Sequence, residues 1–539
     1  MTGPEGRAVS YQYDAANRLS EIVIQVGTFA FSHDLTGRRT GLRYPNGVQT
    51  DYAYDPSGYL TSLSAWISQK PTISSFAYAH DAVGNRTLIT DLSGNHEYAY
   101  DAIDQLTRAA HPTLPPEQFQ YDPVGNRQTT VVDSDNALLE DEDFVYTYDA
   151  KSNRIEKTSK ITGGKTTYAY DPDSRLIKVE TFASLARYKY DPFGRRIEKE
   201  INGQVTRYLY DGPNIFLEYD GQNNIKSRYL HTLAMDDPLA LEQNGKAYYY
   251  HKDGLGSIRS VTDEAGQVIQ SYEYAGFGEI TSRSGSMEQP FTFTGRELDQ
   301  MLGQEETTSW ISYSTELKAG VQDPQGMKGG GRIEIKTPRQ TETLYFFRAR
   351  YYDPKAGRFL TNDPIGFAGG DMNMYRYTRN NPINYRDPLG LWPPEIHNKI
   401  IWEAFESLPL QLRWAIEAGS RYADTFQDPQ DAYMHAMRSR GQTVGEAQRA
   451  MENFIEKHLK NYECEKEKGN LYDAFFELGM ALHPVMDSTS PSHRGFQVWN
   501  GLSDMPGHWL AEREISRQQL QETAKKINRT LFVYGIFLR

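Results

Sequence analysis

A short pattern of alternating aromatic and polar positions recurs through the first half of the chain. The unit is aromatic-x-Tyr-Asp or a close variant, then a turn with Gly, Asn, Ser or Asp, and in most units Arg and an apolar residue. Its period is about 20 residues, and self-similarity of this kind is typical of repeat architectures. The units begin at Tyr11, Tyr52, Tyr78, Tyr98, Phe119, Tyr146, Tyr168, Tyr188 and Tyr208.

Each unit is expected to form a β-hairpin. Residues two apart on a strand share a face, so both rings of a unit point the same way. Asp-Pro or Asp-Ala followed by Gly or Asn forms the turn. No hairpin can bury its aromatic face alone, so we expect the hairpins to stack into one long curved sheet over residues 1–300. Residues 248–280 read as further hairpins, with turns at Asp253-Gly254 and at Glu264 to Gly266.

The pattern stops after Gln300. Residues 301–341 hold no Tyr-Asp unit, and we expect a loose surface loop there.

After Leu391, apolar residues instead recur three or four apart, in the segments 396–408, 411–424, 444–462, 471–483 and 511–532. This period predicts amphipathic helices and hence a separate all-α domain over residues 392–539.

Composition and charge narrow the class of protein. Of 539 residues, 12% are aromatic, which is too many for a disordered chain. The single cysteine, Cys464, excludes an intramolecular disulfide framework and a cysteine zinc finger. The formal net charge is -13, whereas a protein that coats nucleic acid is basic.

Targeting signals are not apparent in the sequence. No apolar run reaches the roughly 18 residues of a membrane span. The longest, LFVYGIFL at 531–538, is much shorter. The first residues lack the basic and apolar regions of a signal peptide. We therefore expect delivery by other machinery, and a start directly before a repeat suggests a fragment of a longer chain.

The repeats resemble the YD repeats of Rhs proteins, bacterial toxin-complex C components and teneurins, over about residues 10–300. This resemblance implies that the repeats wind into a hollow β-shell. In that family a GRELD-like stretch runs almost directly into YFFRARYYDP, so residues 301–341 look like an insertion. The family also implies a secreted toxin, a secretion apparatus and a cognate immunity protein as partners.

Residues 342–391 resemble the Rhs-associated core, an aspartyl-type autoprotease that caps the shell. The resemblance implies cleavage after the last residue of DPLGL, between Leu391 and Trp392. It places the catalytic pair on Arg350 and Asp363, with Asp387 as second carboxylate. Two neighbouring carboxylates can share a proton, and an adjacent Arg keeps one of them ionised. The alternative is that Asp-Pro-x-Gly is only a turn former.

The tail contains six of the twelve histidines, and their spacing suggests metal chemistry. His483 and Asp487 are four residues apart and share a helix face, which Pro491 is expected to end, and His493 follows at once. His508 and Glu512 repeat the spacing of four. Imidazole and carboxylate at this spacing are suitable ligands for zinc. The alternative is that these histidines are ordinary core residues whose ring nitrogens are hydrogen-bonded within the protein.

The same residues resemble the superfamily of zinc-dependent phospholipases C and single-strand nucleases, all-helical enzymes with three zinc ions. In that superfamily the N-terminal Trp is a ligand, Asp487 would bridge two ions, and Asp424 would orient the attacking water. His458 has no counterpart and is expected on a helix surface. The resemblance implies a ligand set of Trp392, His397, Asp424, His435, His483, Asp487, His493, His508 and Glu512.

These resemblances predict a toxin whose tail hydrolyses phosphodiesters after self-cleavage. Cutting after Leu391 would free the amine of Trp392 and so complete a zinc site. The mildly acidic tail favours a phospholipase C acting on phospholipid membranes, because a nuclease needs a basic groove for single-stranded nucleic acid. The short spacing from Trp392 to His397 favours the nuclease branch, which stays open. A non-enzymatic surface or adhesion protein is the alternative of another class.

Overall fold

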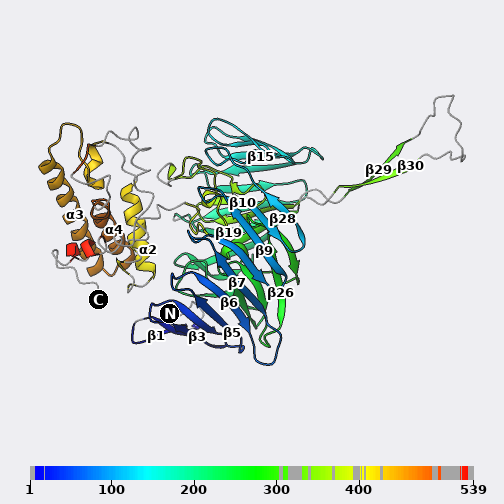
Figure 1. The fold of residues 1–539 in the computed structure, drawn as a ribbon, viewed down its shortest axis with the longest axis horizontal. Coiled ribbons are helices and arrows are strands. Elements are labelled where there is room, and N and C mark those ends of the chain that lie inside the picture. Colours follow the sequence, from blue (N-terminus) through cyan, green and yellow to red (C-terminus); the bar gives the residue numbers. More distant parts are fainter. Residues whose placement is uncertain are drawn as a thin grey trace, which may run out of the picture.

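The structure is a computed structural model of the chain, and Figure 1 shows a large β region beside a helical part. It describes residues 6–302 apart from 17 and 193, and also 307–313, 331–337, 341–366 and 371–391. Further on it describes residues 410–424, 429–488 and 496–498, with single positions between 401–408 and 523–531.

The β region begins with a sheet of eleven strands in which each strand pairs antiparallel with the next. The strands are β1 Ser10–Tyr13, β2 Leu19–Ile24, β3 Gly27–His33, β4 Arg39–Arg43, β5 Gln49–Tyr54, β6 Leu60–Trp66, β7 Ser74–His80, β8 Arg86–Asp91, β9 Gly94–Tyr100, β10 Leu106–His111 and β11 Leu114–Gln118.

A second sheet has sixteen strands in the same consecutive order. Its strands are β12 Val131–Val132, β13 Leu138–Glu140, β14 Phe144–Tyr148, β15 Arg154–Ser159, β16 Lys165–Tyr170, β17 Leu176–Glu180, β18 Leu185–Tyr190, β19 Arg196–Ile201, β20 Gln204–Asp211, β21 Asn214–Tyr219, β22 Ile225–His231, β23 Pro238–Gln243, β24 Lys246–Lys252, β25 Ile258–Thr262, β26 Val268–Tyr274 and β27 Ile280–Ser284.

The expectation of one continuous sheet is therefore wrong, because the hairpins are split between β11 and β12. Strand β11 contains Pro115 and Pro116, which lack the N–H donors that a further strand would need. The repeat that follows at Phe119 forms only an isolated bridge between Tyr121 and Arg127. The hairpin prediction itself is confirmed, including the turns after Asp253 and Asp263, where a backbone N–H bonds the carbonyl four residues on.

The Tyr-Asp pair has the same hydrogen-bonding role in several of the repeats. At Asp171, one carboxylate oxygen accepts the backbone N–H groups of Asp173 and Arg175, and the other accepts Arg175 Nε at 2.6 Å. The preceding Tyr170 donates its hydroxyl to a backbone carbonyl on the strand before, at 2.8 Å. The same tyrosine bond to the first residue of the preceding strand recurs for Tyr54 to Arg39, Tyr100 to Arg86, Tyr190 to Leu176, Tyr210 to Arg196 and Tyr274 to Ile258. Tyr121, which follows β11, bonds in the same way to Leu106, the first residue of β10.

The two sheets pack against each other through apolar side chains. Phe29 and Leu42 of the first sheet share a core cluster with Leu239 and Tyr249 of the second. The hydroxyl of Tyr44 donates to the carbonyl of Tyr250 at 2.9 Å across the same boundary. Burial of these aromatic and aliphatic groups joins strands that lie some two hundred residues apart.

A small third sheet covers β16 to β18 and is formed by β28 Glu297–Leu302, β31 Thr341–Phe347, β32 Arg350–Asp353 and β33 Arg358–Phe359. Short 3-10 turns lie nearby at Phe293–Gly295 and Thr378–Asn380. Charged groups are buried in this contact. Arg154 Nη1 lies 2.8 Å from Asp353 Oδ2, and Arg196 bonds both Asp299 and Glu297.

The segment 301–341 does not consist only of a loop. Strands β28 and β31 pair without a register shift over six residues, from Glu297 with Phe346 to Leu302 with Thr341. A hairpin of β29 Thr307–Tyr313 and β30 Gly331–Thr337 follows and extends away from the β region (Figure 1). The expectation of a loose loop is thus wrong for the described strands, because backbone pairing with an antiparallel partner holds each of them in extended form.

The helical part contains α2 Leu410–Asp424, the 3-10 helix η4 Pro429–His435, α3 Val444–Glu467 and α4 Leu471–Asp487. Thr443 and Glu446 form a capping box that starts α3. Helix α4 packs against both α2 and α3, and Ile416, Leu459 and Leu478 share one core cluster. Most of the expected first and last helices, 396–408 and 511–532, lie outside the described residues.

The end of α4 differs from the sequence expectation. The helix ends at Asp487, with Ser488 as its C-cap, and Pro484 lies inside its last turn. Pro491 therefore does not terminate this helix. A proline in the last turn removes one N–H donor but leaves the final carbonyls free to be capped.

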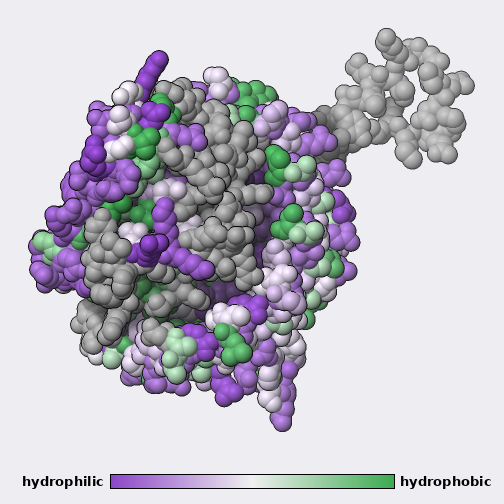
Figure 2. Space-filling model, turned by 60° about the vertical axis from the view of Figure 1, so that its left-hand side comes forward, coloured by the Kyte–Doolittle hydropathy of each residue, from purple (hydrophilic) through white to green (hydrophobic). Residues whose placement is uncertain are grey.

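Where Figure 2 colours the surface by hydropathy, hydrophilic residues dominate and apolar residues form small separate groups. Exposed apolar side chains such as Leu35, Ile161 and Phe182 come from distant turns of the β region. Within the described part of the chain, no helix combines the length and apolar character that crossing a membrane requires.

Candidate functional site

Three buried side chains meet at the centre of the helical part. The Nε2 atom of His483 lies 3.1 Å from Oδ2 of Asp487 and 3.1 Å from Nδ1 of His435. The third side of the triangle, from His435 Nδ1 to Asp487 Oδ2, is 3.2 Å. His435 is 6%, His483 0% and Asp487 3% exposed.

Local structure explains why these groups converge. His483 and Asp487 are separated by one turn of α4, so their side chains lie on the same face, as the spacing predicts. His435 is the last residue of η4, which packs against both α3 and α4. Met434, which precedes His435 in η4, shares a small apolar cluster with Ala423 of α2 and Met480 of α4, which holds η4 against both helices.

The triangle has the dimensions of a metal-ligand set, although the same atoms also lie within hydrogen-bonding distance of one another. One imidazole N–H can point at only one neighbour, whereas here each ligand atom faces two others. For a tetrahedral zinc ion with bonds of about 2.0–2.1 Å, ligand atoms lie roughly 3.3 Å apart, close to the observed separations. Two imidazole nitrogens and one carboxylate oxygen are donors that zinc accepts. The His-His-Asp group could therefore hold one metal ion.

The structure does not describe the side chains of the other predicted zinc ligands. Asp424 is the last residue of α2, and its side chain is not described. Trp392, His397, His493, His508 and Glu512 lie outside the described residues.

His458 is not a surface residue. It is 7% exposed, and its Nδ1 lies 2.6 Å from Oε2 of Glu477 on α4. Its ring packs on Phe454, one turn earlier on α3, with 4.3 Å between ring centroids. The prediction failed because the partly buried carboxylate that pairs with His458 comes from another helix. The phenylalanine four residues earlier in the sequence was the one visible sign that this helix face is apolar.

One neighbour of the triangle was missed from the sequence. Ser420 of α2 is 1% exposed, and its Oγ lies 3.2 Å from Nδ1 of His483. The only sequence sign was that Ser420 precedes Asp424 by one helical turn.

A second candidate site lies at the end of the β region. Arg350 of β32 places Nη2 at 2.8 Å from Asp363 Oδ2 and at 3.5 Å from Asp387 Oδ2. Asp387 Oδ1 accepts the backbone N–H of Leu391 at 3.0 Å, and Arg350 Nε donates to the carbonyl of Gly390. All three charged side chains are buried. The predicted trio is thus brought together beside Leu391, whereas Trp392 lies outside the described residues.

Burial lowers the pKa of the Arg350 guanidinium, while attraction to Asp363 and Asp387 opposes this shift. The guanidinium stacks on Phe359, with 3.7 Å from its central carbon to the ring centroid. Gly390 has φ +67°, and a Cβ there would lie 2.2 Å from the carbonyl oxygen of Phe347. The DPLGL turn therefore requires glycine at this position.

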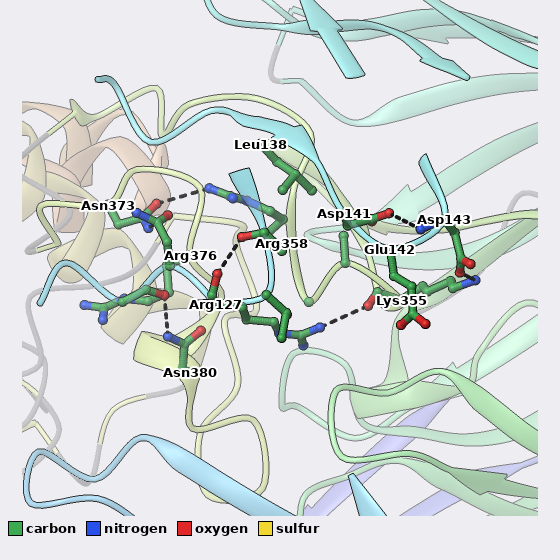
Figure 3. A pocket seen from close by; sticks show the side chains of 16 residues that line it. Arg127, Leu138, Asp141, Glu142, Asp143, Lys355, Arg358, Asn373, Arg376 and Asn380 are labelled. Carbon is green, nitrogen blue, oxygen red and sulfur yellow. Dashed lines mark hydrogen bonds and ion pairs between the residues drawn. The ribbon is translucent and has the colours of Figure 1, made fainter. Parts of the chain in front are cut away.

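A third feature is a cavity of about 170 Å³ at the break between the two large sheets (Figure 3). Its charged groups are partly paired: Arg376 Nε lies 2.7 Å from Asp371, and Lys355 Nζ lies 2.6 Å from Asp143. Asn380 Nδ2 donates to the carbonyl of Gly125 at 2.8 Å. The bond from Asn380 to Gly125 attaches the segment 371–380 to the turn of the repeat that begins at Phe119.

Comparison with known proteins agrees with this architecture. Residues 82–304 match the Teneurin YD-shell family. The tRNA nuclease WapA of Bacillus subtilis is 28% identical over 334 residues, which cover 58% of this chain and 11% of WapA. Double-stranded DNA deaminase toxin A of Burkholderia cenocepacia is 26% identical over 355 residues, covering 64% of this chain and 21% of that toxin.

Among solved structures, the Photorhabdus luminescens Tc holotoxin pore aligns with a TM-score of 0.47 and 19% identity. The alignment covers 73% of this chain and 20% of that one. The chain spans about a tenth of the length of WapA and about a fifth of that of the Burkholderia toxin. The helical part is not identified by these matches. Residues 82–304 of the β region are therefore similar to the Teneurin YD-shell, and the chain is similar to part of the tRNA nuclease WapA.

Proposed function

We propose that this chain is part of an Rhs-type toxin whose helical part, residues 392–539, is a zinc-dependent phosphodiesterase. The His435, His483 and Asp487 triangle carries this proposal, because three potential ligands converge at metal-binding distances in a buried place. Phospholipids are the proposed substrate class. Such a toxin would need a delivery system and an immunity protein as partners.

In this proposal the three residues act as ligands. His435 would bind through Nδ1, His483 through Nε2 and Asp487 through Oδ2, since these atoms face one another. Both imidazoles must be neutral to bind a metal. A bound zinc ion would supply a Lewis acid and lower the pKa of a bound water towards ~7. A three-ion centre follows from the family resemblance alone, with Trp392, His397, His493, His508 and Glu512 as further ligands and Asp424 orienting the water.

Self-cleavage after Leu391 is the second element of the proposal. One carboxylate of the Asp363 and Asp387 pair would take a proton from water as it attacks the Leu391 carbonyl carbon. The other would give a proton to the leaving Trp392 amine, so that a carboxylic acid and an amine are the products. The bond from Leu391 N–H to Asp387 supports this assignment, because it holds the carboxylate next to the bond to be cut.

A single-strand nuclease is the second candidate. Its support is that WapA is a tRNA nuclease and the Burkholderia relative a double-stranded DNA deaminase, so both related toxins act on nucleic acids. The acidic balance of the tail opposes it, because nucleic-acid binding depends on neutralising phosphates.

Metal content, intact mass and activity of the purified chain test these proposals together. We expect bound zinc, a break before Trp392, and release of phosphocholine from phosphatidylcholine vesicles with no loss of single-stranded DNA. Cleavage of the DNA alone would favour the nuclease.

The Asp487→Asn variant should lose zinc and activity. Asp473→Asn, which changes an exposed carboxylate on the same helix, should keep both. Full zinc binding and activity in Asp487→Asn would exclude this metal centre.

A further inference from the structure

We infer that Ser420 is a positioning residue of the candidate metal centre, which holds His483 in the tautomer that can bind a metal. The inference rests on the proposed function in that it takes His483 as a metal ligand. It adds a residue from α2 to a centre that is otherwise formed by α4 and η4.

The two nitrogens of His483 face different partners. Nε2 points into the triangle with His435 and Asp487, while Nδ1 lies 3.2 Å from Ser420 Oγ. A neutral imidazole carries one proton, and only the nitrogen without it can bind a metal. A proton on Nδ1 can be donated to the serine oxygen, which leaves the lone pair of Nε2 directed at the metal position.

Ser420 is needed because the opposite tautomer also has a partner. Asp487 Oδ2 lies 3.1 Å from Nε2 and could accept a proton held there. In that tautomer His483 would be hydrogen-bonded to its fellow ligand and could not bind the metal. The serine hydroxyl offers a competing acceptor on the far side of the ring, at a position where both residues are almost fully buried.

Backbone contact between α2 and α4 sets this distance. A Cβ on Gly419 would lie 1.8 Å from the carbonyl oxygen of Phe476, and one on Gly479 would lie 2.0 Å from that of Ile416. The two helices therefore touch through glycines, and any side chain at either position would push them apart. Ser420 adjoins Gly419, and His483 follows Gly479 by one turn, so this close crossing brings the hydroxyl to the ring.

The test compares zinc affinity across Ser420 variants of the full chain, using competition with a chromophoric chelator and the absorption spectrum of bound Co²⁺. Loss of a hydrogen-bond partner behind a ligand typically weakens metal binding by about 10- to 100-fold. We expect that loss for Ser420→Ala, with an altered Co²⁺ spectrum, and recovery for Ser420→Thr, which restores the hydroxyl. Ser439→Ala, in the loop before α3, is the control and should bind zinc normally.

Two further outcomes separate the inference from the proposed function. Wild-type chain that binds no zinc would overturn both. Zinc binding in Ser420→Ala equal to that of the wild type would overturn only the role of Ser420. If Ser420→Ala unfolds, as circular dichroism would reveal, Ser420→Cys keeps the volume with a weaker acceptor and should show the same loss of affinity. Normal affinity in Ser420→Cys and Ser420→Ala would contradict the inference.

Discussion

Arg350 and Asp363 form a buried ion pair with 2.8 Å between Nη2 and Oδ2, next to the proposed bond of self-cleavage. Replacing Asp363 by Asn keeps the shape but removes a carboxylate that general acid–base catalysis would need. We expect cleavage to slow by about 10²- to 10⁴-fold, the usual contribution of such a group. The intact mass of freshly purified chain reports the cut.

Asp387→Asn should have the same effect, because Asp387 is the partner carboxylate and also bonds Leu391 N–H. Asp173→Asn, in an exposed turn, is the control and should cut normally. Cleavage at the wild-type rate in both active-site variants would refute the assignment. Near-ultraviolet circular dichroism separates this loss from unfolding, since breaking a buried pair typically costs about 3–5 kcal/mol.

Acid should weaken the β region through two buried histidines. Burial lowers the pKa of His231 to about 4 and that of His251 to about 3. Below pH ~6.5 the unfolded chain binds protons that the folded chain does not, so stability falls as the pH drops towards 4. Each unit of pKa difference is worth about 1.4 kcal/mol, and we expect a loss on the order of a few kcal/mol.

Urea unfolding at pH 7 and pH 4.5 measures this loss. His251→Gln should reduce the difference between the two pH values, because glutamine takes up no proton in the unfolded state. His33, which is only partly buried, should matter less when replaced in the same way. An unchanged pH dependence in a His231 and His251 double variant would show that other groups determine acid sensitivity.

The tyrosine bonds between neighbouring strands should contribute measurably to stability. Tyr190 donates its hydroxyl to the carbonyl of Leu176 at 2.6 Å. Tyr190→Phe keeps the ring but leaves that carbonyl without this donor, which should cost about 1 kcal/mol of unfolding free energy. Tyr13→Phe, at an exposed ring near the start of the chain, should change stability by less than about 0.5 kcal/mol. Equal effects of the two changes would argue against a specific role for the bond.

The buried charges beneath the third sheet should be costly to disrupt. Arg196 is fully buried and pairs with both Asp299 and Glu297. Arg196→Met leaves two buried carboxylates short of a partner, and we expect a loss of about 3–5 kcal/mol. Arg187→Met removes an exposed pair with Glu200 and should cost at most about 1 kcal/mol. Thermal unfolding compares the two, and similar losses would contradict the burial argument.

Chelation should destabilise the helical part if it holds zinc. A ligand present at about 1,000 times its Kd adds about 4 kcal/mol to the folded state, so removing it lowers the unfolding temperature. Far-ultraviolet circular dichroism follows the helices during heating with and without EDTA. Asp487→Asn should unfold at the same temperature in both conditions, because its centre lacks one ligand. An EDTA effect of equal size in that variant would place the metal elsewhere.

Local patterns in the sequence predicted more than the contacts between distant segments. The Tyr-x-Tyr-Asp units predicted hairpins because their turns and rings act within a few residues. Spacing alone placed His483 and Asp487 on one helix face. The break after β11 was missed although Pro115 and Pro116 are visible, because the repeat pattern continues past them at Phe119. Ser420 and the partner of His458 could not be predicted, since both contacts depend on how α4 crosses its neighbouring helices.

The tyrosine hydroxyl that reaches the start of the preceding strand has a consequence for how such shells change length. The acceptor is a backbone carbonyl, which every type of residue has. The identity of the residue at the start of the strand can therefore change without loss of the tyrosine hydrogen bond. Adding or deleting one whole repeat therefore gives every tyrosine an equivalent acceptor. Losing half of a repeat would instead remove the strand that supplies the acceptor of one tyrosine. Evolution of this scaffold should thus proceed in complete modules.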